Sequence, residues 1–300
     1  MSTFSVHTLN DGNKVPGVAF GIGTAHFGND DDNLVETLKT AISAGFRHLD
    51  GAEAYRNEGS LGKAIAQSGV PREELFVTTK AGTGLADIPS SFDESLKKLG
   101  LSYVDLYLIH WPYDFCKASY PSIQEAWKQM EAIKDSGRAK SIGVSNFRVR
   151  DLEKIYSLPD LKHPPAVNQI EFHPFMYEAG EELYQYMKNK QIALEAYGPT
   201  SPLTKLLNPG FEEALNNVTK SVASRARKDK VEPGQVLLRL AAQRGAIVVT
   251  TSGKDWRMRE QLAAGALPEL TQDEVDSLVK AAKPAPQRVF MKHMDGDDEY

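Results

Sequence analysis

Four side chains with acid–base chemistry stand at or just after the ends of short apolar segments. Asp50, Lys80 and His110 each end one such segment, and Tyr55 follows Asp50 on the next loop. If these segments are buried strands, Asp50 and Lys80 are natural ion-pair partners, because an unpaired buried charge is costly. A lysine ammonium beside a tyrosine stabilises the tyrosinate and lowers a pKa that is ~10 in water. These residue types therefore predict a general-acid site, in which Tyr55 protonates a carbonyl oxygen and His110 orients the carbonyl.

The segments that must position these side chains are short, often β-branched and almost continuously apolar, as strands buried on both faces are. They are residues 18–24, 46–50, 75–80, 104–110, 139–145, 166–172, 192–197 and 246–252. Amphipathic helical patterns alternate with them. Four of these patterns have clear limits: Asp32-Asn33 to Gly45, Ser90-Ser91 to Gly100, Ser122 to Gly137, and Pro233 to Gly245. The alternation predicts an α/β fold, a (β/α)₈ TIM barrel, whose active site lies at the carboxyl ends of the strands.

Two segments fall outside the alternation. Residues 4–9 and 14–16 flank Asp11-Gly12 and predict an N-terminal β-hairpin that plugs the barrel floor. Residues 283–300 predict an extended C-terminal tail near the active-site face, with Val289-Phe290-Met291 as its packing part. Because no linker divides the chain, we expect residues 1–300 to form a single barrel domain.

Composition excludes several classes of function. The net charge of −5 leaves no basic footprint for nucleic acid, and the longest apolar runs are too short to span a membrane. The histidines lack the mutual spacing of metal ligands, so no metal site is expected. The single cysteine, Cys116, fits a reducing compartment, and the first residues do not resemble a signal peptide, so we expect a cytoplasmic protein.

The segments FRHLDGAEAYRNE, LFVTTK, VDLYLIHWP, SIGVSNF, VNQIEFHP and VLLRLAAQRG resemble successive signatures of the aldo-keto reductase superfamily. They span residues 17–261 in the family's order and spacing. The pattern, including VVTTSGKDWRMREQL, is most similar to fungal NADPH-dependent reductases of α-keto lactones, α-keto amides and conjugated polyketones.

The resemblance implies a role for each matching residue. Asp50, Tyr55, Lys80 and His110 match the catalytic tetrad, with Tyr55 as proton donor. The positions that match contacts to the NADPH nicotinamide and pyrophosphate are Gly23, Thr24, Asp50, Ser145, Asn146, Gln169, Tyr197 and Gly198. Of these, Ser145, Asn146 and Gln169 are implied to hold the carboxamide, and Tyr197 to stack on the ring.

The segment for the 2′-phosphate departs from the family pattern. Where many members have Ile-Pro-Lys-Ser, this chain has Val-Thr-Thr-Ser, so Thr251 replaces the lysine. Ser252, Lys254 and Arg257 remain as candidates for the phosphate, which favours cationic donors. Glu260 and Gln261 match positions that contact the adenine amine.

The substrate pocket is predicted from the rim and the resemblance together. Trp111 follows His110, and Ala25, Phe27 and Phe290 are candidates for the remaining wall. Aromatic walls favour flat or cyclic substrates. The prediction is therefore an NADPH-dependent carbonyl reductase, a monomer or weak dimer, that acts on a small-molecule activated ketone or aldehyde of the α-keto lactone, α-keto amide or α-dicarbonyl type.

Three alternatives stay open. The same fold serves as a nucleotide-sensing regulatory protein, which turnover of a simple dicarbonyl would exclude. An aldehyde or sugar reductase would prefer unactivated substrates. A barrel aldolase would use Lys80 as a Schiff-base amine, which borohydride would trap; the predicted Asp50–Lys80 pair argues against it.

Overall fold

The computed structural model describes residues 2–23, 25–117, 119–283 and 286–296. Parallel strands close into a barrel in the order β10-β3-β4-β5-β6-β7-β8-β9. The strands are β3 (Val18–Gly21), β4 (His48–Asp50), β5 (Phe76–Ala81), β6 (Val104–Ile109), β7 (Ala139–Ser145), β8 (Val167–Glu171), β9 (Ala193–Tyr197) and β10 (Ile247–Thr250). The predicted (β/α)₈ barrel is confirmed. Several predicted strands were too long, since residues at their ends, such as Phe46, Phe172 and Ser252, lie outside the observed strands.

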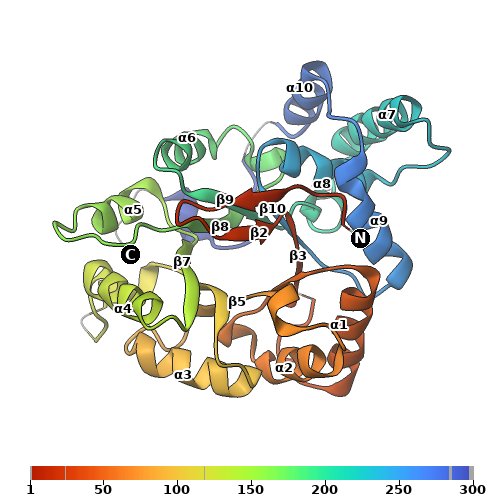
Figure 1. The fold of residues 1–300 in the computed structure, drawn as a ribbon. Coiled ribbons are helices and arrows are strands. Elements are labelled where there is room, and N and C mark those ends of the chain that lie inside the picture. The colour runs from red at the N-terminus through yellow and green to blue at the C-terminus, as the bar shows by residue number, and fades with distance from the viewer. Residues whose placement is uncertain (1, 24, 118, 284–285, 297–300) are drawn as a thin grey trace.

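Helices surround the strands on all sides (Figure 1). They are α1 (Asp32–Ala44), α2 (Glu58–Gln67), α3 (Ile88–Leu99), α4 (Ile123–Asp135), α5 (Val149–Tyr156), α6 (Glu181–Asn189), α7 (Pro209–Ala226), α8 (Pro233–Gln243), α9 (Asp255–Ala263) and α10 (Gln272–Ala281). The apolar faces of most of them pack on the strands; in α4, for example, Trp127 and Met130 are fully buried. In contrast, α7 and α10 pack with α8 in a separate apolar cluster. Within the described ranges, no helix is both long and apolar enough to cross a bilayer.

Side-chain caps set where the helices begin. The predicted helix start at Ser122 is confirmed, and Ser122 and Glu125 form the reciprocal capping box of α4. The predicted start of α3 at Ser90-Ser91 is wrong, because Asp87 caps the helix by accepting from Ser90 N. Pro89 then lies in the first turn, where a missing N–H costs nothing.

The N-terminal hairpin consists of β1 (Val6–Thr8) and β2 (Lys14–Pro16), which pair antiparallel. Leu9 N donates to Asn13 O, and Gly12 takes a φ of 84° in the turn, which a residue with a Cβ would adopt at a cost. Leu9 and Val15 are buried against the strand side chains Leu106 and Ile247. The hairpin therefore plugs the barrel floor, as predicted.

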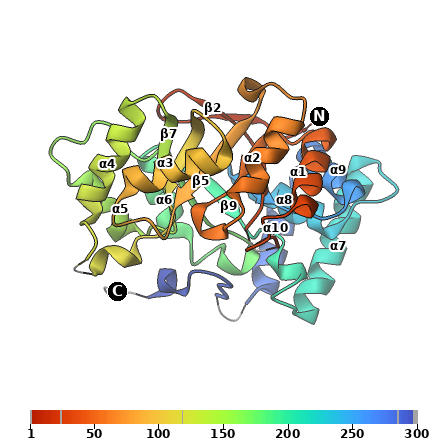
Figure 2. The same cartoon turned by 90° about the horizontal axis from the view of Figure 1, so that it is seen from below.

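The C-terminal segment lies at the other end of the barrel. Figure 2 shows it on the side opposite the hairpin. Val289 N and Phe290 N both donate to the Glu171 carboxylate at the end of β8, at 2.9 Å. His293 Nε2 is 3.2 Å from Asn146 O, just beyond β7. The tail thus packs on the carboxyl ends of β7 and β8, the face on which the predicted site residues gather.

Candidate active site

A buried ion pair forms the centre of the carboxyl-end rim. Lys80 Nζ donates to Asp50 Oδ1 and to Gly51 O, both at 2.7 Å. Lys80 is fully buried and Asp50 is 3% exposed, so water screens the pair little. Burial alone would lower the pKa of Lys80, but the neighbouring Asp50 and Tyr55 outweigh burial and raise that pKa. Lys80 is therefore a fixed cation at neutral pH.

Tyr55 lies above this pair, at the end of the short 3₁₀ helix η1 (Glu53–Tyr55). Lys80 Nζ is 5.1 Å from the centre of the Tyr55 ring. Gly23 lies so close that a Cβ there would fall 2.9 Å from Tyr55 Cζ, so the site requires a glycine. Burial raises the pKa of Tyr55 and Lys80 lowers it, and the net direction is upward. The lysine effect predicted from the sequence is thus one of two opposing effects.

His110 completes the cluster from the end of β6. Its ring centre is 5.4 Å from that of Tyr55, and the two rings are nearly perpendicular. Burial and then the Lys80 charge hold the pKa of His110 well below its ordinary value. The imidazole is therefore neutral and carries one N–H, which can donate to a carbonyl oxygen.

A chain of hydrogen bonds links the residues predicted to hold the nicotinamide. Gln169 Nε2 donates to Asp50 Oδ1 at 2.8 Å, which ties this chain to the ion pair. Ser145 Oγ donates to Gln169 O at 2.7 Å, and Asn146 Nδ2 donates to Ser145 Oγ at 3.0 Å. Tyr197 Oη donates to Asn146 Oδ1 at 2.8 Å. The structure therefore gathers Ser145, Asn146, Gln169 and Tyr197 beside Asp50.

The predicted phosphate residues gather after β10. Ser252 Oγ accepts from Lys254 N at 3.1 Å, at the start of α9. The Lys254 ammonium and the Arg257 guanidinium lie 5.9 and 4.9 Å from the ring of Trp256. Among the described residues, neither cation forms an ion pair with a carboxylate. Further along α9, Gln261 Nε2 donates to Thr251 O, and burial raises the pKa of Glu260.

The predicted substrate residues fall into two groups. Trp111 stacks on His110 at 4.5 Å, and Phe290 meets Tyr197 edge to face at 5.8 Å, so both lie on the rim. Gly198 follows Tyr197 with a φ of 66°, and a Cβ on it would be 3.7 Å from the Phe290 ring. Ala25 is exposed and Phe27 is 59% exposed, so their place in the pocket wall stays a prediction. Thr24 lies outside the described residues.

The structure also shows positioning residues that the sequence analysis missed. Glu53 Oε2 accepts from the backbone N–H of Gly82, Thr83 and Gly84, which fixes η1 on the loop after β5. Asp114 Oδ2 accepts from Trp111 Nε1 at 2.7 Å and so orients the indole. Glu171 and Glu195 are buried acids within predicted strands. That position was the available signal, since strands buried on both faces are normally apolar.

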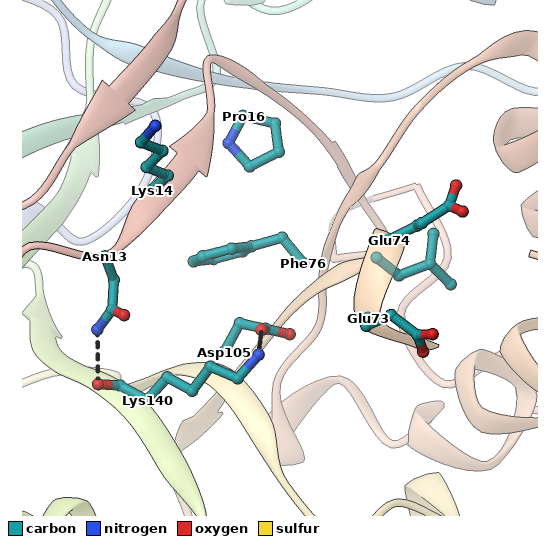
Figure 3. Close-up of a pocket in the computed structure, with 9 residues that line it drawn as sticks. Asn13, Lys14, Pro16, Glu73, Glu74, Phe76, Asp105 and Lys140 are labelled. Carbon is teal, nitrogen blue, oxygen red and sulfur yellow. Dashed lines mark hydrogen bonds and ion pairs between the residues drawn. The ribbon is translucent and has the colours of Figure 1, made fainter. Parts of the chain in front are cut away.

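A separate cavity of about 280 Å³ lies at the opposite end of the barrel (Figure 3). Two of its polar side chains contact the protein itself: Lys140 Nζ pairs with Asp105 at 2.9 Å, and Asn13 Nδ2 donates to Lys140 O at 2.9 Å. Asp105 also accepts from Arg72 and from Val77 N. Phe76, at the start of β5, lines the cavity, which is therefore remote from Lys80 near the other end of that strand.

The carboxyl rim of the closed parallel barrel thus holds a buried lysine–aspartate pair, a tyrosine and a neutral histidine, side chains that can carry acid–base chemistry. The chain belongs to the aldo/keto reductase family, whose sequence pattern matches residues 19–283. The resemblance inferred from the sequence is confirmed.

Similar proteins support this assignment over the whole chain. A Schizosaccharomyces pombe protein described as an NAD/NADP-dependent indole-3-acetaldehyde reductase is 40% identical over 288 residues, 95% of this chain and 98% of that protein. A Saccharomyces cerevisiae NADPH-dependent alpha-keto amide reductase is 35% identical and covers 98% of this chain and 96% of its own. A crystal structure of a Bombyx mori aldo-keto reductase in complex with NADP has a TM-score of 0.83 and 31% identity, covering 99% of this chain and 98% of that one. The predictions of an oxidoreductase and of NADP(H) as cofactor are confirmed at the level of the family.

The ion pair leads to a first prediction about stability. Asp50→Asn leaves the Lys80 charge buried without a counter-charge and should lower the free energy of unfolding by ~3–5 kcal/mol. Removing both charges in Asp50→Asn/Lys80→Met should cost less than the sum of the two single changes. Denaturant unfolding of the four proteins measures this coupling. Strictly additive losses would show that the two side chains do not stabilise each other.

Proposed function

We propose that this protein is an NADPH-dependent carbonyl reductase in which Tyr55 protonates the carbonyl oxygen. The observation that carries the proposal is the placement of Lys80, which is bonded to Asp50 and Gly51 and lies 5.1 Å from the Tyr55 ring. A cation fixed at that point stabilises the tyrosinate that proton donation produces. The single-domain boundary 1–300 stays a prediction.

The residues present fit NADPH at both of its ends. Lys254 and Arg257 flank Trp256 without a carboxylate partner among the described residues and suit a doubly charged 2′-phosphate. Ser145, Asn146 and Gln169 offer the amide and hydroxyl groups that a carboxamide needs, and Tyr197 offers a ring face. When bound, the cofactor supplies the hydride that reduces the carbonyl carbon.

The side chains of this chain then carry the proton chemistry. Neutral His110 donates a hydrogen bond to the substrate oxygen and orients it toward Tyr55. Tyr55 gives its proton to that oxygen as negative charge develops on it. Lys80, held by Asp50, stabilises the resulting tyrosinate, and Gln169 fixes Asp50.

The proposed substrates are activated carbonyls: α-keto lactones, α-keto amides and α-dicarbonyls. Trp111 and Phe290 supply aromatic surface on the two sides of the rim, which favours flat or cyclic molecules. The alpha-keto amide reductase among the relatives supports this class. The indole-3-acetaldehyde reductase supports an aromatic aldehyde as the second candidate class.

The alternative functions fit less well. A Schiff-base lysine must be neutral to attack a carbonyl, whereas Asp50 and Tyr55 raise the pKa of Lys80. A purely nucleotide-sensing role would give the assembled cluster of Tyr55, His110 and Lys80 no function.

Replacing Tyr55 by Phe tests the proton donor. The change removes one hydroxyl, so folding and NADPH binding should persist, the latter followed by quenching of protein fluorescence. Turnover of a dicarbonyl should fall by ~10²–10⁴, the range for lost general-acid catalysis. A Tyr55→Phe protein with nearly wild-type kcat would refute the assignment.

The proposed phosphate site predicts selectivity between cofactors. Arg257→Ala should weaken NADPH by ~1.5–3 kcal/mol and NADH little, because only NADPH carries the extra phosphate. Arg259→Ala is the matched control, since Arg259 lies on the same helix but pairs with Asp255 at 3.0 Å. Binding titrations with both cofactors measure the effect. Equal weakening of NADPH and NADH would mean that Arg257 supports the structure instead.

The proposed pocket predicts a substrate preference. For activated carbonyls, kcat/KM should exceed that for simple alkanals or open-chain sugars by at least about tenfold, or ~1.4 kcal/mol. Trp111→Ala should reduce this preference more than it weakens NADPH binding, and Phe27→Ala, at an exposed position, should change it less. Initial rates over a substrate panel give the comparison. Higher kcat/KM for xylose or alkanals would refute the activated-carbonyl class and leave the reductase proposal standing.

A further inference from the structure

A second buried acid lies in the barrel below the proposed tetrad. Glu195 is on β9 and is fully buried, and among the described residues neither of its carboxyl oxygens has a hydrogen-bond partner within 3.5 Å, although the Gln169 amide lies near enough to lower its pKa. An ionisable side chain, that of His48, lies within ion-pair range of Glu195, with 3.8 Å between His48 Nε2 and Glu195 Oε1. A buried carboxyl without hydrogen bonds costs free energy.

Groups from five elements of the barrel surround Glu195. They are His48 and Asp50 from β4, Lys80 from β5, Gln169 and Ile247 in register on β8 and β10, and Tyr55 from η1. Ala193, two residues earlier on β9, packs in the apolar cluster of the barrel floor with Ile247. An apolar side chain would therefore fill the position of Glu195 without an unpaired polar group.

Glu195 is electrostatically connected to the ion pair. Burial and then Asp50 raise the pKa of Glu195 to about 8, whereas Lys80 and Gln169 lower it. His48 cannot balance a Glu195 charge, because burial lowers the pKa of His48 to about 4 and leaves its imidazole neutral. In return, an ionised Glu195 raises the pKa of Tyr55.

We propose that Glu195, buried below the Asp50–Lys80 pair, is a positioning residue. While its carboxyl is neutral, the Lys80 charge acts on Tyr55 at full strength. When the Glu195 carboxyl ionises, Tyr55 becomes a weaker proton donor. The inference rests on the proposed reductase function and deepens it. Glu195 touches neither substrate nor reacting atoms and acts through Lys80. Each deprotonation of Glu195 adds one negative charge beside the pair, which opposes formation of the tyrosinate.

The test is the pH dependence of hydride transfer in a single turnover, with NADPH already bound and an α-dicarbonyl added. In the wild-type protein, the rate constant should fall as pH rises through about 8, the pKa of Glu195. We expect a fall of at least about fivefold, equivalent to ~1 kcal/mol of barrier. Glu195→Gln keeps the shape but not the titration, so this fall should disappear. Glu195→Met provides a second neutral side chain for the same comparison.

Glu58→Gln is the matched control. Glu58 is another buried carboxyl, and burial raises its pKa, but it lies on α2 and accepts from Thr79 Oγ1 at 2.6 Å. It is not among the groups that shift the pKa of Tyr55 or Lys80. Glu58→Gln should therefore retain the wild-type fall. Loss of the fall in Glu58→Gln as well would overturn the inference, because the effect would not be specific to Glu195.

Thermal stability gives a readout that does not need turnover. The pKa of Glu195 is about 4.5 in the unfolded chain and about 8 in the folded chain, so unfolding at a pH between these values releases a proton. The stability that the protonated Glu195 gives the wild type, measured against Glu195→Gln, is therefore fully present below about pH 4.5 and is lost as the pH rises toward about 8. Both readouts together support the proposal. A stability difference with an unchanged pH profile, or no difference in either, would overturn it; absence of any wild-type carbonyl reduction would overturn the proposed function itself.

Discussion

The ion pair between Asp50 and Lys80 is the constraint on which the site depends. A lysine that is fully buried is tolerated only if a counter-charge and hydrogen-bond acceptors meet it, and here Asp50 and Gly51 O do so at 2.7 Å. This requirement fixes the ends of two adjacent strands, β4 and β5, relative to each other. The loop after β4 then carries Tyr55 over the lysine, and Glu53 ties that loop to the loop after β5. The acid–base geometry follows from the need to keep the buried Lys80 cation paired.

The same pair organises its surroundings. Gln169 bonds to Asp50 and continues through Ser145 and Asn146 to Tyr197. Tyr197 meets Phe290 of the tail, and Glu171 holds the tail by two backbone N–H groups. The ion pair, the residues proposed to bind the nicotinamide, and the tail therefore form one connected network of polar and aromatic side chains. Hydrogen bonds and one edge-to-face ring contact thus connect the tail with Asp50.

Much of this arrangement could be predicted from the sequence, and for a physical reason. Eight short apolar runs that alternate with amphipathic helices favour a closed parallel barrel, and polar residues at the run ends then share one rim. Asp50, Tyr55, Lys80 and His110 were found in this way. Contacts that depend on side-chain direction could not be found: the cap at Asp87, the Trp111–Asp114 bond and the exposure of Phe27 all depend on local loop geometry. Glu195 was missed although its place within an apolar strand was a signal, because the groups around it come from other strands far away in the sequence.

Under the proposed function, Lys80, held charged by Asp50, makes Tyr55 a better proton donor than its burial alone would allow. The pKa of Tyr55 itself tests this, measured by NMR of protein with tyrosine isotope-labelled at Cζ, in the wild type and in Lys80→Met. The Tyr55 resonance is assigned by its absence in Tyr55→Phe. We expect a higher pKa of Tyr55 in Lys80→Met than in the wild type, because the opposing effect of burial remains. An equal or lower pKa in Lys80→Met would show that Lys80 does not assist proton donation by Tyr55.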